Sequence, residues 1–201
     1  MMKMVSKMSF LKDAFREAAR REFAHVPEES ELNVVFSDNY LARMEELLSK
    51  QTIKRCFFIG HSDAPDALRP LLDITIERCI VIYQISQYVV GHYGNFDRLV
   101  TSALVEAKRI HPEIQLLCLT PYHPPERVVE LPPEFDGTLY PEGMETVPRQ
   151  FAIAHANRYM VDHCDRLVAY VFRDGSNAGK VLRRAKKNGT VIDNLAEYNY
   201  E

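Results

Sequence analysis

The sequence has little net charge, no closely spaced cysteines and no long apolar run, and each absence excludes a class of protein. The 25 basic and 28 acidic side chains leave a formal charge of −3, which gives no general reason to expect nucleic acid or an acidic membrane as a partner. The first 23 residues have neither the pattern of a signal peptide nor a membrane span. Without C-x-x-C spacing, the cysteines are expected to be small buried residues in a reducing cytoplasm, namely Cys56, Cys79, Cys118 and Cys164.

Motifs that identify several enzyme classes are also missing. There is no G-x-S-x-G elbow, no G-x-x-x-x-G-K-[ST] loop and no carboxylate pair at a diagnostic spacing. A metal triad could be imagined from His61, His92 and His123, but none of them has helical or hairpin ligand spacing with a partner. We therefore expect no metal ion and no cofactor.

Residues 1–52 differ from the rest of the chain. Apolar residues recur at helical spacing from Phe10 to Ala19, an acidic segment follows, and Ser37 opens a second helical stretch. We expect a helical appendage of two helices, whose apolar stripes would be covered by the main domain or by a second copy of the chain in a homo-oligomer. A DNA-reading helix pair is the alternative, but the acidic loop and the second helix would repel phosphate.

Residues 53–201 form a second unit, in which short apolar runs alternate with helical patterns. The expected strands are 56–60, 86–91, 115–120, 166–172 and 190–195, with a short candidate at 138–143. The expected helices are about 64–83, 96–110, 148–165 and 178–188. Short apolar strands separated by single helices predict an α/β fold with a mainly parallel sheet sandwiched by helices, and right-handed crossovers make it Rossmann-like.

The segments after the strands carry the candidate binding residues. In a sheet of this kind the loops that leave the carboxyl ends of the strands gather at one edge, where ligands bind. Glycine-rich turns at two of these ends, 91–95 and 175–179, favour a phosphate-bearing ligand. The candidates from these loops are Gly60, His61, Ser62, Gly91, His92, Gly94, Asn95, Asp97, Gly175, Ser176 and Gly179.

The stretch VVGHYGNFDRLV is the most unusual of these segments. Gly91 and Gly94 would let the backbone adopt left-handed angles and let an anionic ligand approach the amides. Asn95 is expected to cap the following helix, and Asp97 in its first turn suits the helix dipole. The alternative is that both glycines only permit a tight turn and that Asp97 serves only the helix end.

The expected helix from Pro148 adds further polar candidates. His155, Arg158 and Asp162 fall on one narrow stripe. The guanidinium of Arg158 could fork onto a phosphate or a carboxylate. The alternative is an ion pair between Arg158 and Asp162 on a solvated face. The residues expected on the buried side are Phe151, Ala154, Met160, Val161 and Cys164.

The order of these motifs resembles that of the SLOG superfamily. The residues that carry the likeness are GHS after the first strand, VVGHYGNFDRLV after the second, YPEG before a helix, PRQFAIAHANRYMVDHCDRLVAYV and AKKNGTVIDNL. The nearest match is the YpsA-like branch of small bacterial proteins, and it covers about residues 54 to 195. The resemblance implies a Rossmann-like fold that binds a nucleotide or nucleotide-derived ligand. The positions that it implies are Gly60, His61, Gly91, Gly94, Phe96, Asp97, Arg149, Asn157, Arg158, Asp162, Gly175 and Gly179.

The chain also departs from the superfamily pattern. Relatives commonly have G-H-R where this chain has Gly60-His61-Ser62, so a cation that could meet phosphate is lost. The LOG-type phosphoribohydrolases of the superfamily have P-G-G-x-G-T followed by a glutamate, whereas residues 175–189 contain no acid. Cleavage of an N-glycosidic bond needs a carboxylate, which only Asp97 could supply here.

Three functional hypotheses follow from these observations. The first is a cytoplasmic binding module or sensor for a nucleotide-like metabolite, with backbone amides and Arg149 or Arg158 around the phosphate and Asp97 accepting from a ribose hydroxyl. The second is a nucleotide-processing enzyme related to phosphoribohydrolases or deoxyribosyltransferases, with Asp97 as its carboxylate. The third is a DNA-associated role like that of the DprA branch, against which the missing basic patch argues.

Overall fold

The computed structural model describes residues 54–123 and 129–198. The helical appendage expected at 1–52, its boundary with the second unit and its part in a homo-oligomer lie outside these residues. None of the described helices combines the length and apolar character needed to cross a membrane.

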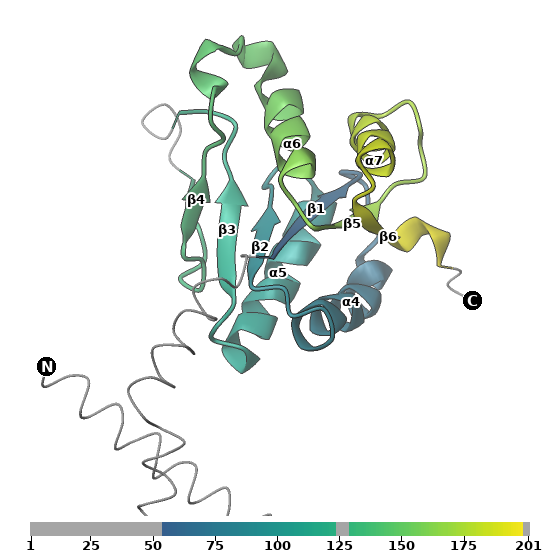
Figure 1. Ribbon diagram of the computed structural model, residues 1–201. Coiled ribbons are helices and arrows are strands. Elements are labelled where there is room, and N and C mark those ends of the chain that lie inside the picture. The colour runs from purple at the N-terminus through teal and green to yellow at the C-terminus, as the bar shows by residue number, and fades with distance from the viewer. Residues whose placement is uncertain (1–53, 124–128, 199–201) are drawn as a thin grey trace, which may run out of the picture. The chain divides into compact units, whose positions relative to one another are not determined.

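The described residues are built around a parallel sheet of six strands (Figure 1). In chain order the strands are β1 (Arg55–Gly60), β2 (Gln87–Val90), β3 (Gln115–Leu119), β4 (Gly137–Leu139), β5 (Arg166–Tyr170) and β6 (Val191–Asn194). Their order across the sheet is β4-β3-β2-β1-β5-β6. The predicted Rossmann-like α/β fold is therefore confirmed, and β4 corresponds to the short candidate strand.

Four helices cover the two faces of the sheet, because the chain winds outward from β1 in both directions. They are α4 (Arg69–Val81), α5 (Asn95–Ile110), α6 (Ala152–Asp162) and α7 (Asn177–Asn188). Helices α4 and α5 lie on one face, and α6 and α7 lie on the other (Figure 1). The shorter 3-10 helices are η1 (Asp66–Leu68), η3 (Met144–Thr146), η4 (Arg149–Phe151) and η5 (Leu195–Glu197).

The core consists of two apolar layers, one on each face of the sheet. Along β1, Cys56 and Phe58 pack under α4 and α5, whereas Phe57 and Ile59 pack under α6 and α7. This alternation explains why the strand reads as a continuous apolar run, since both of its faces are buried. The cysteines are free thiols; three of them are buried as expected, whereas Cys164 is half-buried.

Helix α5 buries its apolar stripe from Phe96 to Leu104, but Ile110 at its end is exposed. Helix α6 differs from expectation on its buried side. Phe151 is 50% exposed and Ala154 is also exposed. The α-helix begins at Ala152, so Phe151 belongs to the preceding 3-10 turn and the buried stripe starts one residue later than expected. Its apolar positions are Ala152, Ala156, Met160 and Val161, with Cys164 half-buried beyond the helix end.

Candidate functional site

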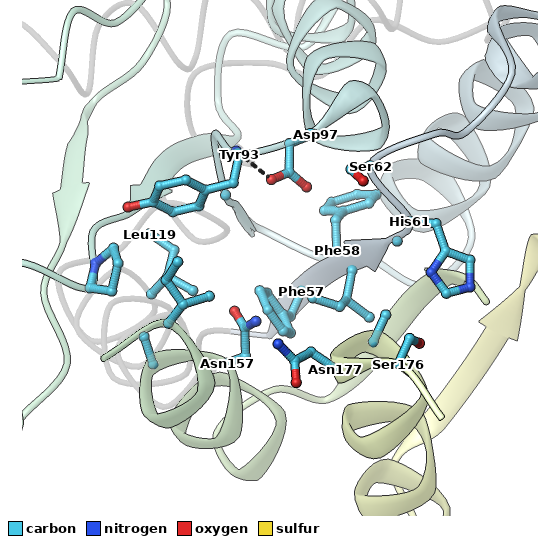
Figure 2. Close-up of a pocket in the computed structure, with 18 of the residues that line it drawn as sticks. Phe57, Phe58, His61, Ser62, Tyr93, Asp97, Leu119, Asn157, Ser176 and Asn177 are labelled. Atoms are coloured by element: carbon cyan, nitrogen blue, oxygen red, sulfur yellow. Dashed lines mark hydrogen bonds between the residues drawn. The ribbon is translucent and has the colours of Figure 1, made fainter. Parts of the chain in front are cut away.

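A cavity of about 310 Å³ opens at the carboxyl edge of the sheet, where the chain reverses its winding between β1 and β5. Parallel sheets of this type bind their ligands at such a switch point. The cavity is lined by the segments after β1, β2, β3 and β5, together with the start of α7 and one side of α6 (Figure 2). Its polar and charged lining consists of His61, Ser62, Tyr93, Asp97, Asn157, Arg173, Ser176 and Asn177.

Asp97 directs its carboxyl group into this cavity from the first turn of α5 (Figure 2). The backbone amide of Tyr93 donates to Asp97 Oδ2 at 2.9 Å. A Cβ atom on Gly91 would lie 2.7 Å from the same oxygen, so the glycine leaves the space that this carboxylate occupies. The turn therefore fixes the side chain of Asp97 as well as the start of α5.

The prediction that Gly91 and Gly94 adopt left-handed backbone angles is wrong. Neither residue has a positive φ, and Gly94 is extended at φ −149° and ψ 177°. The glycines are instead required for close approach, since a Cβ on Gly94 would lie 2.7 Å from the Cα of Ser62. A Cβ on Gly60 would likewise meet the ring of Phe96. Gly60 and Gly94 thus let the start of α5 pack directly on the end of β1, while Gly91 makes room for Asp97.

Burial raises the pKa of Asp97 to about 6, although the backbone amides of Tyr93 and Gly94 oppose the shift by donating to the carboxylate. A carboxyl group with this pKa is mostly ionised at neutral pH and still exchanges a proton readily. It can accept a hydrogen bond from a ligand hydroxyl, or act as a general acid or base.

His61 is buried and holds the ends of β1 and β5 together. Its Nε2 accepts from the backbone amides of Phe172 and Arg173, each at 3.2 Å. Burial, and secondly the charge of Arg173, lower the pKa of this imidazole, which keeps Nε2 available as an acceptor. His61 lines the cavity as predicted, but this nitrogen is engaged by the protein itself.

The turn before α7 lines one end of the cavity. Ser176 is the N-cap residue, with its hydroxyl accepting from the amide of Gly179 at 2.9 Å and donating to the carbonyl of Arg173 at 2.7 Å. Asn177 and Ala178 follow it in the lining. Amides in the first turn of a helix have no acceptor within the helix and lie at the positive end of its dipole. This end of the cavity therefore suits an anion.

Gly175 and Gly179 do not line the cavity themselves. A Cβ on Gly179 would lie 2.4 Å from the carbonyl oxygen of Asp174, whereas a Cβ on Gly175 would meet nothing within 4 Å. Gly179 thus allows the turn to close tightly onto α7, and Gly175 has no such steric role.

Helix α6 brings only one of its predicted polar residues to the cavity. Asn157 lines it and faces Asn177 (Figure 2). Asp162 instead receives two hydrogen bonds of 2.6 Å from Arg184, so the alternative prediction of an ion pair with Arg158 is wrong. Arg158 and Asp162 lie in a separate surface hollow with His155.

Three more predicted residues lie outside the cavity lining. Asn95 does not cap α5, because Gly94 is the N-cap residue and the Asn95 amide nitrogen donates 2.6 Å to the carbonyl of Ala64. The Nδ1 atom of His92 lies 3.6 Å from Cys118 Sγ.

Arg149 lies with its guanidinium 5.2 Å from the ring centre of Tyr122, in a neighbouring hollow.

Sequence reasoning missed Arg173, which lines the cavity next to the start of α7. Its guanidinium is 2.6 Å from Asp63 Oδ1, and both side chains are about half exposed. The signal was its position directly after an apolar strand, in the same loop as Ser176. Tyr93, Asn177 and Ala178 were missed in the same way, although each belongs to a turn that the sequence singles out.

No group of three or more His, Cys, Asp or Glu side chains in residues 54–123 and 129–198 is placed to hold a metal ion. His92 and Cys118 do not make an activated thiol pair, because burial and the charge of Asp97 raise the pKa of Cys118 to about 12. The chemistry of the cavity is therefore that of one carboxyl group, backbone amides and neutral polar side chains, with Arg173 at its edge.

Comparison of the chain with protein-family models and with curated proteins finds no match.

Proposed function

We propose that this cavity binds a nucleotide or nucleotide-derived ligand and that the protein is a binding module or sensor for it. The observation that carries the proposal is the convergence of an anion-suited helix start and a buried carboxyl group on one cavity of about 310 Å³. That volume is within the range of small-molecule sites. The sequence resemblance to the SLOG superfamily supports the same class of ligand.

The phosphate end of the ligand would lie at the start of α7. The amides of Asn177 and Ala178 would donate to it, and Arg173 could leave Asp63 to add positive charge, since their ion pair is exposed. Asp97 would accept a hydrogen bond from a ribose hydroxyl on the opposite wall, away from the phosphate. Asn157, which lies beside Asn177, offers both a donor and an acceptor to the same ligand (Figure 2).

The test is a thermal-unfolding panel with ribose 5-phosphate and the common ribonucleoside monophosphates. A ligand that binds only the folded protein raises its unfolding temperature. Asn177→Asp is expected to abolish this rise, because a carboxylate would then face the phosphate, while the helix keeps a favourable residue in its first turn. Asn177→Ser is the uncharged control and should retain the rise. The absence of a rise with every compound would reject the proposal.

A second candidate is a nucleotide-processing enzyme of the phosphoribohydrolase or deoxyribosyltransferase type. The observation that favours it is the pKa of about 6 for Asp97 inside the cavity, which suits a general acid or base. Incubation with nucleoside monophosphates and detection of the free base distinguishes the two functions. Base release that Asp97→Asn removes would support the enzyme, whereas binding without base release supports the sensor.

A further inference from the structure

A second hollow of about 260 Å³ adjoins the ligand cavity at the carboxyl ends of β3 and β4. Pro121, directly after Thr120 at the end of β3, lines both hollows. Ala152 at the start of α6 lines the second hollow, and Ile153 beside it lines the first. The two spaces are therefore neighbours along one edge of the sheet, and we refer to the second as the aromatic hollow.

The aromatic hollow has the chemistry of a site for a flat ring. Tyr122, His123 and Tyr140 supply three ring systems, of which His123 and Tyr140 meet edge to face with their centres 5.7 Å apart. Met144, which is 5% exposed, adds a polarisable apolar side chain. A planar ligand ring could stack on these groups and bury its apolar face.

Arg149 gives the aromatic hollow a hydrogen-bond donor. Its guanidinium lies 5.2 Å from the ring centre of Tyr122, and it makes no ion pair with a carboxylate in residues 54–123 and 129–198. The side chain is exposed, so its N–H groups can turn toward a ligand in the hollow. Ring nitrogens and carbonyl oxygens of a nucleobase are acceptors that suit a guanidinium.

The order of the strands sets the order of the candidate sites along the edge of the sheet. The sheet runs β5, β1, β2, β3 and β4, with α7 following β5, Asp97 following β2 and the aromatic hollow beyond β3. Strands lie about 4.8 Å apart, so roughly 14 Å separates β5 from β3. An anion site, a hydroxyl acceptor and a ring site thus succeed one another in the order phosphate, ribose and base.

We infer that the aromatic hollow is the nucleobase subsite of the ligand whose phosphate lies at the start of α7. This inference rests on the proposed function and adds where the base is recognised. Tyr122 provides the stacking surface and Arg149 donates to the acceptor atoms of the ring. The first cavity, with Asp97 on its wall, then holds the sugar.

Calorimetric titrations with ribose 5-phosphate and with the common ribonucleoside monophosphates test the inference, since only the latter carry a base. At least one monophosphate is expected to bind about tenfold more tightly than ribose 5-phosphate, and Tyr122→Leu should remove most of that advantage. Arg149→Gln, at an exposed position, should reduce it without altering the fold. In both variants the affinity for ribose 5-phosphate should stay unchanged.

Tyr159→Leu is the matched control, because Tyr159 is also half-buried against the same core layer, but its ring stacks on His163 and it lines neither hollow. This variant should keep the full advantage of the base. A monophosphate that binds more tightly than ribose 5-phosphate but is unaffected by Tyr122→Leu and Arg149→Gln would overturn the inference and leave the proposed function standing. Equal binding of ribose 5-phosphate and the monophosphates would also overturn the inference and leave the proposed function standing. If neither ligand class bound, both proposals would be rejected.

Discussion

At the scale of single residues, Asp97 supplies the carboxyl group of the cavity. Its folded pKa of about 6 lies above the ordinary value of 3.8, so the folded state holds this proton more tightly than the unfolded state does. The contribution of Asp97 to stability is therefore lost as the pH rises from about 4 to about 6. At neutral pH the ionised carboxyl group of Asp97 therefore lowers the free energy of unfolding.

Asp97→Asn is expected to remove this destabilisation, because an amide does not ionise. At pH 7 the free energy of unfolding should rise by about 1–3 kcal/mol, since one pKa unit corresponds to about 1.4 kcal/mol. Urea unfolding between pH 4 and pH 8 measures the effect. Asp63→Asn is the control, because its ion pair with Arg173 lowers the pKa of Asp63 and causes no such destabilisation. An unchanged pH dependence in Asp97→Asn would show that this carboxyl group is not buried as described.

His61 is a residue whose role is to hold two strand ends together. Its replacement by Ala would leave the amides of Phe172 and Arg173 without their acceptor, at a cost of roughly 1–3 kcal/mol of unfolding free energy. Gln can place an oxygen near the position of Nε2, so His61→Gln is expected to retain part of this stability. Chemical denaturation compares the two variants, and equal losses would contradict the role of Nε2.

At the scale of secondary structure elements, the cavity depends on how closely α5 approaches the end of β1. Gly94→Ala would place a methyl group 2.7 Å from the Cα of Ser62, and the start of α5 would have to move. We expect a loss of about 1–3 kcal/mol in unfolding free energy together with weaker ligand binding. Thermal and urea unfolding measure the first effect, and titration measures the second.

Gly175→Ala is the matched control for this prediction. A Cβ there meets nothing within 4 Å, and Gly175 does not have a positive φ. Its stability should stay within about 0.5 kcal/mol of the parent protein. If both alanine variants behaved alike, close packing of the two turns would not be the reason for the glycine at position 94.

At the scale of the whole molecule, the sheet was predictable because it depends on periodicity. Strands such as QYVV at 87–90 are buried on both faces, and α5 carries a regular apolar stripe, so their types follow from local pattern. The winding order then places Asp97 and Ser176 at the same edge. This is why two turns far apart in the sequence could be predicted to share a site.

Residue roles within the site were less predictable, because they depend on distances between segments. Nothing local indicates that His61 would accept from the amides after β5, or that Asp162 would pair with Arg184 in place of Arg158. Arg149 was expected to meet phosphate, but it lies over Tyr122. Such partners are set by tertiary packing, which the sequence pattern does not encode directly.

The central claim is that the start of α7 holds the anionic end of a ligand. Amide nitrogen–proton correlation spectra, recorded during titration with ribose 5-phosphate and with nucleoside monophosphates, test it most directly. The account predicts saturable shifts of the Asn177 and Ala178 amides with every ligand that binds, and their loss in Asn177→Asp. Binding that leaves these two amides unmoved, or shifts confined to surfaces remote from α7, would contradict the account.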